Sequence, residues 1–187
     1  MRPRPFALFN ADMSLPPTPR DTKDWTWTLE RRCPDCGLDA SEVVHEELGM
    51  LIRDNADRWQ PVLADPDAAQ RPRDDVWSPL EYACHVRDVH LVFAERVTRM
   101  LAEDDPLFAN WDQDQAAVDA DYAGQDPAVV ARELADAAGT VAGLYDDVAG
   151  AAWLRRGRRD NGSEFTVESI GRYHLHDVHH HLWDVRG

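Results

Sequence analysis

Apolar residues recur at helical spacing in four stretches of the chain. These stretches cover about 41–63, 79–101, 127–153 and 167–185, and in each of them large apolar side chains return every three or four positions. That periodicity is typical of amphipathic helices, each of which buries one apolar stripe. No clear series of alternating strands accompanies them. The pattern therefore predicts an all-α fold, a bundle of four helices.

The second helix has the clearest start signal. Ser78 is suited to cap the helix, Pro79 takes the first helical position, and Glu81 completes a capping box. Trp77 and Tyr82 occupy the two positions of a hydrophobic staple around that cap. We therefore expect this helix to begin at residue 79 and to hold its first turn rigidly.

Two connections between the helices differ in character. The segment 102–126 is acidic and aromatic, and loops of that length often cover a binding site. The segment 154–165 is basic and contains glycine, which indicates a turn.

The front of the chain has a different pattern. Residues 1–24 carry five prolines, which predicts an extended arm, and Trp25 to Leu29 alternate large and small side chains, as in a short strand or an extended packing segment. A tight turn, Cys33-Pro34-Asp35-Cys36-Gly37, follows. We therefore divide the chain into an irregular extension over 1–40, which contains the CxxC turn, and a helical bundle over 41–187.

Composition narrows the class of protein. Among 187 residues, 20 are Lys or Arg and 35 are Asp or Glu, which gives a net charge of −15. Such a charge repels nucleic acid and anionic lipid but draws divalent cations toward a site with ligands. No run approaches the length of a membrane helix and no signal peptide is recognisable, so we expect a cytoplasmic protein whose three cysteines are reduced.

Histidine is concentrated in the fourth helical stretch, which contains five of the eight: His174, His176, His179, His180 and His181. His176 and His180 are four residues apart, so they project from one helix face and can chelate one divalent metal. Spacing also allows His176 with His179, whereas His174 and His181 share another face. His85, on the apolar face of the second helix, is the best third ligand, although a lone histidine there is more often a hydrogen-bonded core residue.

The sequence resembles the DinB superfamily. The resemblance rests on residues 77–85, WSPLEYACH, followed about ninety residues later by His176-Asp177-Val178-His179-His180. It implies that His85, His176 and His180 converge on a divalent metal (zinc, nickel or iron) at one end of an up-down-down-up bundle. The segment 102–126 then provides the crossover between two helices that run in the same direction.

The resemblance also implies an activity. The superfamily includes transferases and isomerases that use mycothiol or bacillithiol, and it resembles the N-terminal domain of ergothioneine-pathway enzymes. We therefore expect a thiol S-transferase or isomerase, a homodimer, that acts on a small electrophile with a low-molecular-weight thiol such as mycothiol. The alternatives are a hydrolase that uses metal-bound water and a non-catalytic metal-binding stress-response protein. Asp177 and Asp88 are candidate partners for the ligand imidazoles.

The CxxC turn departs from the family pattern. Such a turn often forms half of a zinc site, and His45 or another histidine of the fourth helix can complete it as a second, structural zinc site. Cys33 and Cys36 can equally be buried free thiols. A redox pair is the third interpretation, although the βαβ context of thioredoxin-like chemistry is missing.

Overall fold

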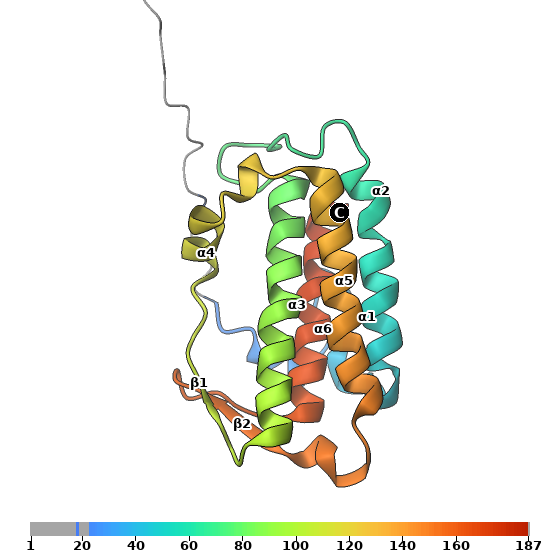
Figure 1. The fold of residues 1–187 in the computed structure, drawn as a ribbon, viewed down its shortest axis with the longest axis vertical. Helices are drawn as coiled ribbons and strands as arrows, with labels where there is room; N and C mark the ends of the chain where they lie inside the picture. The colour runs from blue at the N-terminus through green and yellow to red at the C-terminus, as the bar shows by residue number, and fades with distance from the viewer. Residues whose placement is uncertain (1–17, 19–22, 187) are drawn as a thin grey trace, which may run out of the picture.

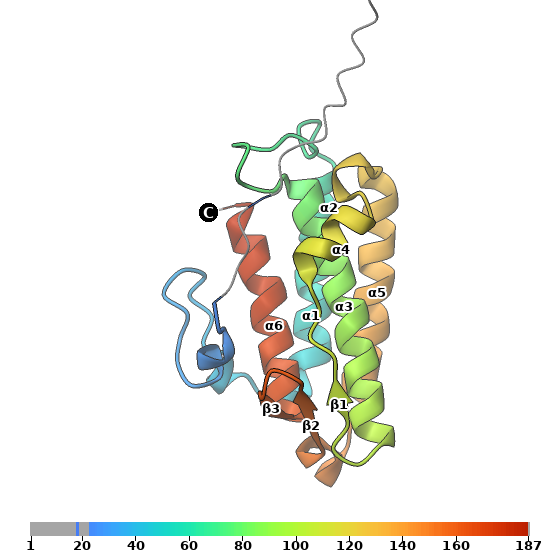
Figure 2. The same ribbon diagram turned by 90° about the vertical axis from the view of Figure 1, so that its left-hand side faces the viewer.

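The computed structural model describes residue 18 and residues 23–186, and its core is a bundle of four helical rods (Figure 1). The helices are α1 (Leu48–Asp57), continued by α2 (Trp59–Leu63), then α3 (Pro79–Ala102), α5 (Pro127–Asp147) and α6 (Val167–Asp184). The rod of α1 and α2 runs parallel to α6, and α3 and α5 run in the opposite direction (Figures 1 and 2). This arrangement confirms the predicted four-helix bundle and its up-down-down-up order.

The crossover between α3 and α5 returns along the whole length of the bundle (Figure 2). It contains β1 (Leu107–Phe108), the short helix α4 (Gln113–Asp119) and a 3-10 turn, η4 (Tyr122–Gly124). The Asp112 side chain caps α4 by accepting a hydrogen bond from Gln115 N. The predicted loop is therefore a structured crossover.

A small sheet closes the lower end of the bundle. Strands β2 (Arg156–Arg159) and β3 (Glu164–Thr166) form an antiparallel hairpin, and β1 pairs in parallel with β2. The basic turn predicted at 154–165 is thus a hairpin. Its strands were not recognisable from the sequence because they are three or four residues long and because the crossover provides the third strand.

The segment before α1 contains short 3-10 helices that were not predicted. Thr26–Leu29 form a 3-10 helix, η1, in place of the short strand or extended packing segment predicted there, because Asp24 Oδ1 accepts a hydrogen bond from Thr26 N and Thr28 Oγ1 donates to Trp25 O. Two further 3-10 turns, η2 (Ala40–Glu42) and η3 (His45–Glu47), precede α1, so the first long helix starts later than predicted. The arm expected over 1–24 falls almost wholly outside the described residues.

The start of α3 has the predicted capping box. Ser78 Oγ accepts a hydrogen bond from Glu81 N at 3.2 Å, and Ser78 N donates to Glu81 Oε2 at 2.8 Å. The rings of Trp77 and Tyr82 meet edge to face with centroids 5.5 Å apart, which confirms the staple. This rigid first turn positions His85, four residues beyond Glu81.

The core lies between the four rods. Its fully buried side chains include Leu48, Ile52, Trp59, Leu80, Val97, Leu134, Val141 and Ile170. Gly171 allows α6 to approach α1 closely, because a Cβ there would lie 2.6 Å from Leu48 Cδ1. Among the described residues, no helix is both long enough and apolar enough to cross a membrane.

A polar cluster interrupts this core and makes stability depend on pH. His90 is fully buried, its Nδ1 lies 2.9 Å from His174 Nε2, and Tyr145 Oη lies 3.2 Å from His174 Nδ1. Burial lowers the pKa of His90 to about 3. Between about pH 6.5 and 3 the unfolded chain therefore binds a proton at His90 that the folded chain does not, and stability falls with falling pH.

We expect His90 to contribute up to about 1.4 kcal/mol per pH unit to the loss of stability on acidification. His90→Gln retains a polar side chain but no titrating group, so its unfolding free energy should depend less steeply on pH. Urea unfolding of both proteins in chelator, at several pH values between 6.5 and 4, measures the two slopes. Equal slopes would show that His90 does not titrate differently in the folded and unfolded chains.

Candidate metal centres

The second half of α6 presents potential metal ligands on two adjoining faces. Successive helix residues are rotated by about 100°, so the pair 176 and 180 points in one direction and the pair 177 and 181 in another. Each pair joins residues from a different part of the chain. The four-residue group is Cys33, Cys36, His176 and His180, and the three-residue group is His85, Asp177 and His181; within each group the ligand atoms lie within 4.8 Å of one another.

The structure thus divides the three predicted ligands between two groups. His176 and His180 do lie together, as their spacing predicts, but they face the CxxC turn. His85 instead meets Asp177 and His181, which have the same four-residue spacing one position further along α6. Asp177 and His181 were not predicted as candidate ligands, although the i,i+4 rule and the ligand chemistry of carboxylates apply to them equally.

Three ligand atoms face one another in the three-residue group. Asp177 Oδ1 lies 3.3 Å from His181 Nε2 and 3.8 Å from His85 Nε2. The two imidazole rings meet edge to face, with centroids 4.6 Å apart. One carboxylate and two imidazoles are a ligand set used by both catalytic zinc and non-haem iron sites.

Three buried polar atoms of this group have no hydrogen-bond partner among the described residues. Both ring nitrogens of His85 and Oδ1 of Asp177 are buried, and no described residue forms a hydrogen bond with them. Buried polar atoms without partners are rare and call for an explanation. A divalent cation between these atoms would explain them, because it would bind Asp177 Oδ1 and an imidazole nitrogen of each histidine. The residues therefore fit a metal ion.

The charges in this group are strongly coupled. Burial opposes ionisation of Asp177, but His181 and His85 outweigh it and hold the pKa of Asp177 well below its usual range. Burial likewise lowers the pKa of His181, but Asp177 and Asp184 overcome it and raise that pKa to about 9. The pKa of His85 is lowered, mainly by burial. A cation bound here would replace the proton on His181 and would balance the negative charge of the carboxylates in its place.

Neighbouring side chains orient the two histidines. Asp184 Oδ2 lies 2.9 Å from His181 Nδ1, so that nitrogen has a partner and Nε2 faces Asp177. Trp111 of the crossover stacks on His85, with ring planes 7° apart, and Trp77 contacts the same imidazole. Asp88, the other expected partner, instead accepts hydrogen bonds from Tyr122 Oη and Arg87 Nε.

A cavity of about 1000 Å³ opens beside both groups. Asp177, His181, His176 and His180 are among its lining residues. Its aromatic walls come from the segment before η1, the cap of α3, the crossover and α6: Trp25, Trp77, Tyr82, Trp111, Tyr173 and Trp183. Among the described residues, seven aspartates, Asp177 included, line it together with Lys23, Arg159 and the protonated His181, so its charged side chains are mostly acidic. The cavity therefore favours cations and uncharged molecules over anions.

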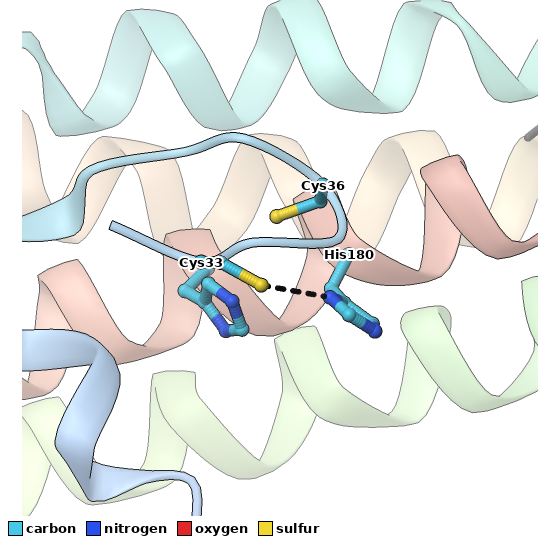
Figure 3. Close-up of side chains that lie close together, drawn as sticks. Cys33, Cys36 and His180 are labelled. Atoms are coloured by element: carbon cyan, nitrogen blue, oxygen red, sulfur yellow. Dashed lines mark hydrogen bonds between the residues drawn. The ribbon is translucent and has the colours of Figure 1, made fainter. Parts of the chain in front are cut away.

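The four-residue group joins the CxxC turn to α6. Cys33 Sγ lies 3.6 Å from His180 Nδ1, and Cys36 points toward the same space from the other side of the turn (Figure 3). Burial, followed by the charge of His180, lowers the pKa of His176 to about 4, and burial also lowers that of His180. Burial, reinforced by Cys33, raises the pKa of Cys36 to about 11.

His45, the first choice to complete a cysteine site, lies elsewhere. Its Nδ1 is 3.3 Å from Glu168 Oε1, and its ring packs on Trp153 with centroids 4.6 Å apart. The structure places His176 and His180 beside the two thiols, which is the other alternative that the sequence left open, a histidine of the last helix.

Fold and site together define a class of protein, a small up-down-down-up bundle whose second and fourth long helices carry candidate metal ligands beside a cavity. The family model of the DinB superfamily matches residues 52–185, and the chain belongs to that superfamily. A solved structure, YfiT from Bacillus subtilis, superposes with a TM-score of 0.68 at 19% sequence identity over 78% of this chain and 87% of its own. YfiT is described as a probable metal-dependent hydrolase with an unusual four-helix bundle topology. No curated protein matches the sequence.

Proposed function

We propose that this protein is a metal-dependent enzyme whose catalytic cation is held by His85, Asp177 and His181. The observation that carries the proposal is the set of buried atoms without hydrogen-bond partners, Asp177 Oδ1 and the His85 nitrogens, beside a cavity of about 1000 Å³. Sites with three protein ligands keep a coordination position open, which is the mark of catalytic metal sites. The proposal replaces His176 and His180 of the sequence prediction by Asp177 and His181.

We further propose that the reaction is the transfer of a small thiol, of the mycothiol type, to an electrophile. A bound divalent cation lowers the pKa of a coordinated thiol or water and so supplies a nucleophile near neutral pH. The sulfur forms a bond to an electrophilic carbon, the leaving group departs with its electron pair, and the thiol proton passes to solvent. The mostly acidic lining favours an uncharged or cationic thiol and electrophile over polyanionic ones.

The surrounding residues have separable roles in this proposal. Asp177 would balance the charge of the cation, and Asp184 orients His181 through Nδ1. Trp111 and Trp77 pack on the His85 imidazole, fix its orientation and keep water from its buried side. The aromatic walls bind the apolar parts of the two substrates.

The second candidate is a metal-dependent hydrolase, in which water is the nucleophile. The ligand set favours it, because two histidines and one carboxylate also hold the zinc ion of several hydrolases. The description of YfiT as a probable metal-dependent hydrolase agrees with it. Both candidates require the same three ligands, so the choice of nucleophile separates them.

Turnover by the metal-loaded chain tests the proposal. Protein reconstituted separately with Zn²⁺, Ni²⁺ and Fe²⁺ is given chlorodinitrobenzene with mycothiol, and p-nitrophenyl acetate without thiol. We expect metal-dependent conjugation, with chloride released. Ester hydrolysis without thiol would support the hydrolase instead, and failure of both reactions with all three metals would overturn an enzymatic role.

A matched pair of histidine variants tests the ligands. We expect His181→Ala to lose the cation of the three-residue group and to lower turnover by at least about 100-fold, because even the loss of an outer partner costs 10–100-fold in metal sites. His45→Ala removes a histidine outside both groups and should retain metal and activity. Metal analysis of the dialysed proteins gives the stoichiometry. Equal metal content in the two variants would contradict the assignment.

A further inference from the structure

We propose that Cys33, Cys36, His176 and His180 form a second metal site, a closed four-coordinate zinc site that fastens the segment 23–40 to α6. This proposal does not depend on the catalytic role of the three-residue group. It assigns a role to the CxxC turn, which lies outside the residues matched by the family model.

The chemistry of the four ligands selects zinc. Two thiolates and two imidazoles are a set that structural zinc sites use, and four protein ligands leave no position for substrate. Their ligand atoms lie within 4.8 Å of one another, and Cys33 is completely buried. Nε2 of His176 is also buried, and none of the described residues hydrogen bonds to it. A shared cation gives that nitrogen a partner.

The turn has the backbone of a metal-binding knuckle. Gly37 N donates a hydrogen bond to Cys33 O at 3.0 Å, and Cys33 N donates to Leu38 O at 2.9 Å. Gly37 has a φ of +77°, which only glycine adopts without strain. The loop therefore folds back at Gly37 and turns both sulfur atoms toward the second half of α6 (Figure 3).

The site has a structural consequence for the cavity. Trp25, from the segment that the ion would fasten, packs on both histidine ligands, with ring centroids 5.8 Å from His176 and 5.0 Å from His180. Trp25, Asp24 and Asp35 all line the cavity. A zinc ion here would therefore hold one wall of the cavity in place while the neighbouring faces of α6 present Asp177 and His181.

Cobalt substitution tests the site directly, because thiolate ligation gives Co²⁺ an intense charge-transfer absorption that histidine and carboxylate ligands do not. The reduced full-length chain is titrated with Co²⁺, and we expect the thiolate band to saturate by two equivalents, because the three-residue group also takes up metal. X-ray absorption of the zinc-loaded chain should show Zn–S scattering at about 2.3 Å. A reduced chain that binds Co²⁺ without the thiolate band would overturn the proposal.

Two cysteine variants provide the matched comparison. Cys36→Ser should weaken zinc binding at this site by at least about 100-fold, since outer partners alone account for 10–100-fold. Cys84→Ser changes a buried cysteine whose Sγ is near Tyr122 O and Gln125 Oε1, far along the chain from the turn, and should keep the full band. Loss of the band in both variants, or in neither, would contradict the assignment.

The same titration separates this proposal from the catalytic one. His181→Ala should keep the thiolate band but lose the metal of the three-residue group, whereas His176→Ala should lose the band. A disulfide between Cys33 and Cys36 that persists in the zinc-treated chain would instead support the redox interpretation and overturn the zinc site.

Hydrogen exchange tests the fastening. With free zinc at 100-fold its dissociation constant, amides of the segment 23–40 that open by local unfolding should exchange up to about 100-fold more slowly than in chelator. Amides in the middle of α5, a helix that contributes no residue to either group, provide the internal reference. Equal protection of the segment with and without zinc would overturn the fastening role, even if the ion binds.

Discussion

Replacing Asp177 by asparagine should weaken metal binding at the three-residue group by at least about 100-fold, and turnover should fall with it. Asparagine retains the size of the side chain but removes the negative charge that balances the cation. It also removes the carboxylate that lies 3.3 Å from His181 Nε2 and 3.8 Å from His85 Nε2. Competition with a chelator of known affinity measures the change, and the cobalt–thiolate band monitors the other group independently.

The control for this variant is another aspartate of the same cavity. Asp75 lines the cavity without belonging to either ligand group, and its carboxylate pairs with Arg73 at the surface. Asp75→Asn removes the same charge from the cavity. It should nevertheless leave the metal stoichiometry unchanged, because Asp75 belongs to neither ligand group. If both aspartate variants weaken metal binding equally, the general acidity of the cavity, and not ligation by Asp177, accounts for metal binding.

The largest effect on stability is expected from the buried ion pair between Arg71 and Glu81. Glu81 is 3% exposed, accepts a hydrogen bond from Arg71 Nε at 2.8 Å and receives another from Ser78 N. Arg71→Ala leaves that carboxylate buried without its cation, which costs about 3–5 kcal/mol in comparable pairs. Urea unfolding in chelator measures the free energy of unfolding without a contribution from metal binding.

The pH dependence of this pair has a definite sign. Burial raises the pKa of Glu81, but the hydrogen bonds from Arg71 and Ser78 outweigh it, so the folded pKa lies below the ordinary value of 4.5. Its contribution to stability is therefore complete above about pH 4.5 and is lost as pH falls through the lower folded value. The difference in stability between wild type and Arg71→Ala should shrink over that range.

An exposed pair provides the matched control. Arg99 and Glu103 form an i,i+4 ion pair at the end of α3 with the same chemistry but in solvent. Glu103→Gln should leave the unfolding midpoint unchanged within error, because solvent screens such pairs. A large loss in Glu103→Gln, or none in Arg71→Ala, would contradict the role of burial.

The helices could be predicted because their signals are local. The cap formed by Ser78, Pro79 and Glu81 lies within four consecutive residues, and α3 starts at the predicted position. The hairpin at 156–166 could not be predicted in this way, because β1, from a distant part of the chain, pairs with it. Likewise, the 3-10 helix at Thr26 depends on side-chain hydrogen bonds that compete with extended structure.

The division of the histidines shows why spacing alone cannot assign ligands. The pairs 176 and 180, and 177 and 181, have the same spacing, and only the rotation of α6 about its axis decides which pair faces His85. Burial of Leu175, Val178 and Leu182 and the close approach at Gly171 fix that rotation. These contacts join segments far apart in sequence, so the sequence predicts a chelating helix but not which face meets which partner.

The parallel direction of α3 and α5 has a consequence for how such a protein can change its specificity. Two parallel neighbours need a return path as long as the bundle itself, and here that path carries Trp111 over the His85 imidazole. Its helix α4 has no buried residue, so it contributes little to the core. Substitutions and length changes in α4 can therefore reshape the mouth of the cavity with little loss of core packing, whereas Phe108 and Tyr122 of the same path are buried in the core and fix its two ends. In the proposed enzyme, substrate range would therefore depend on a segment whose middle part contributes little to stability.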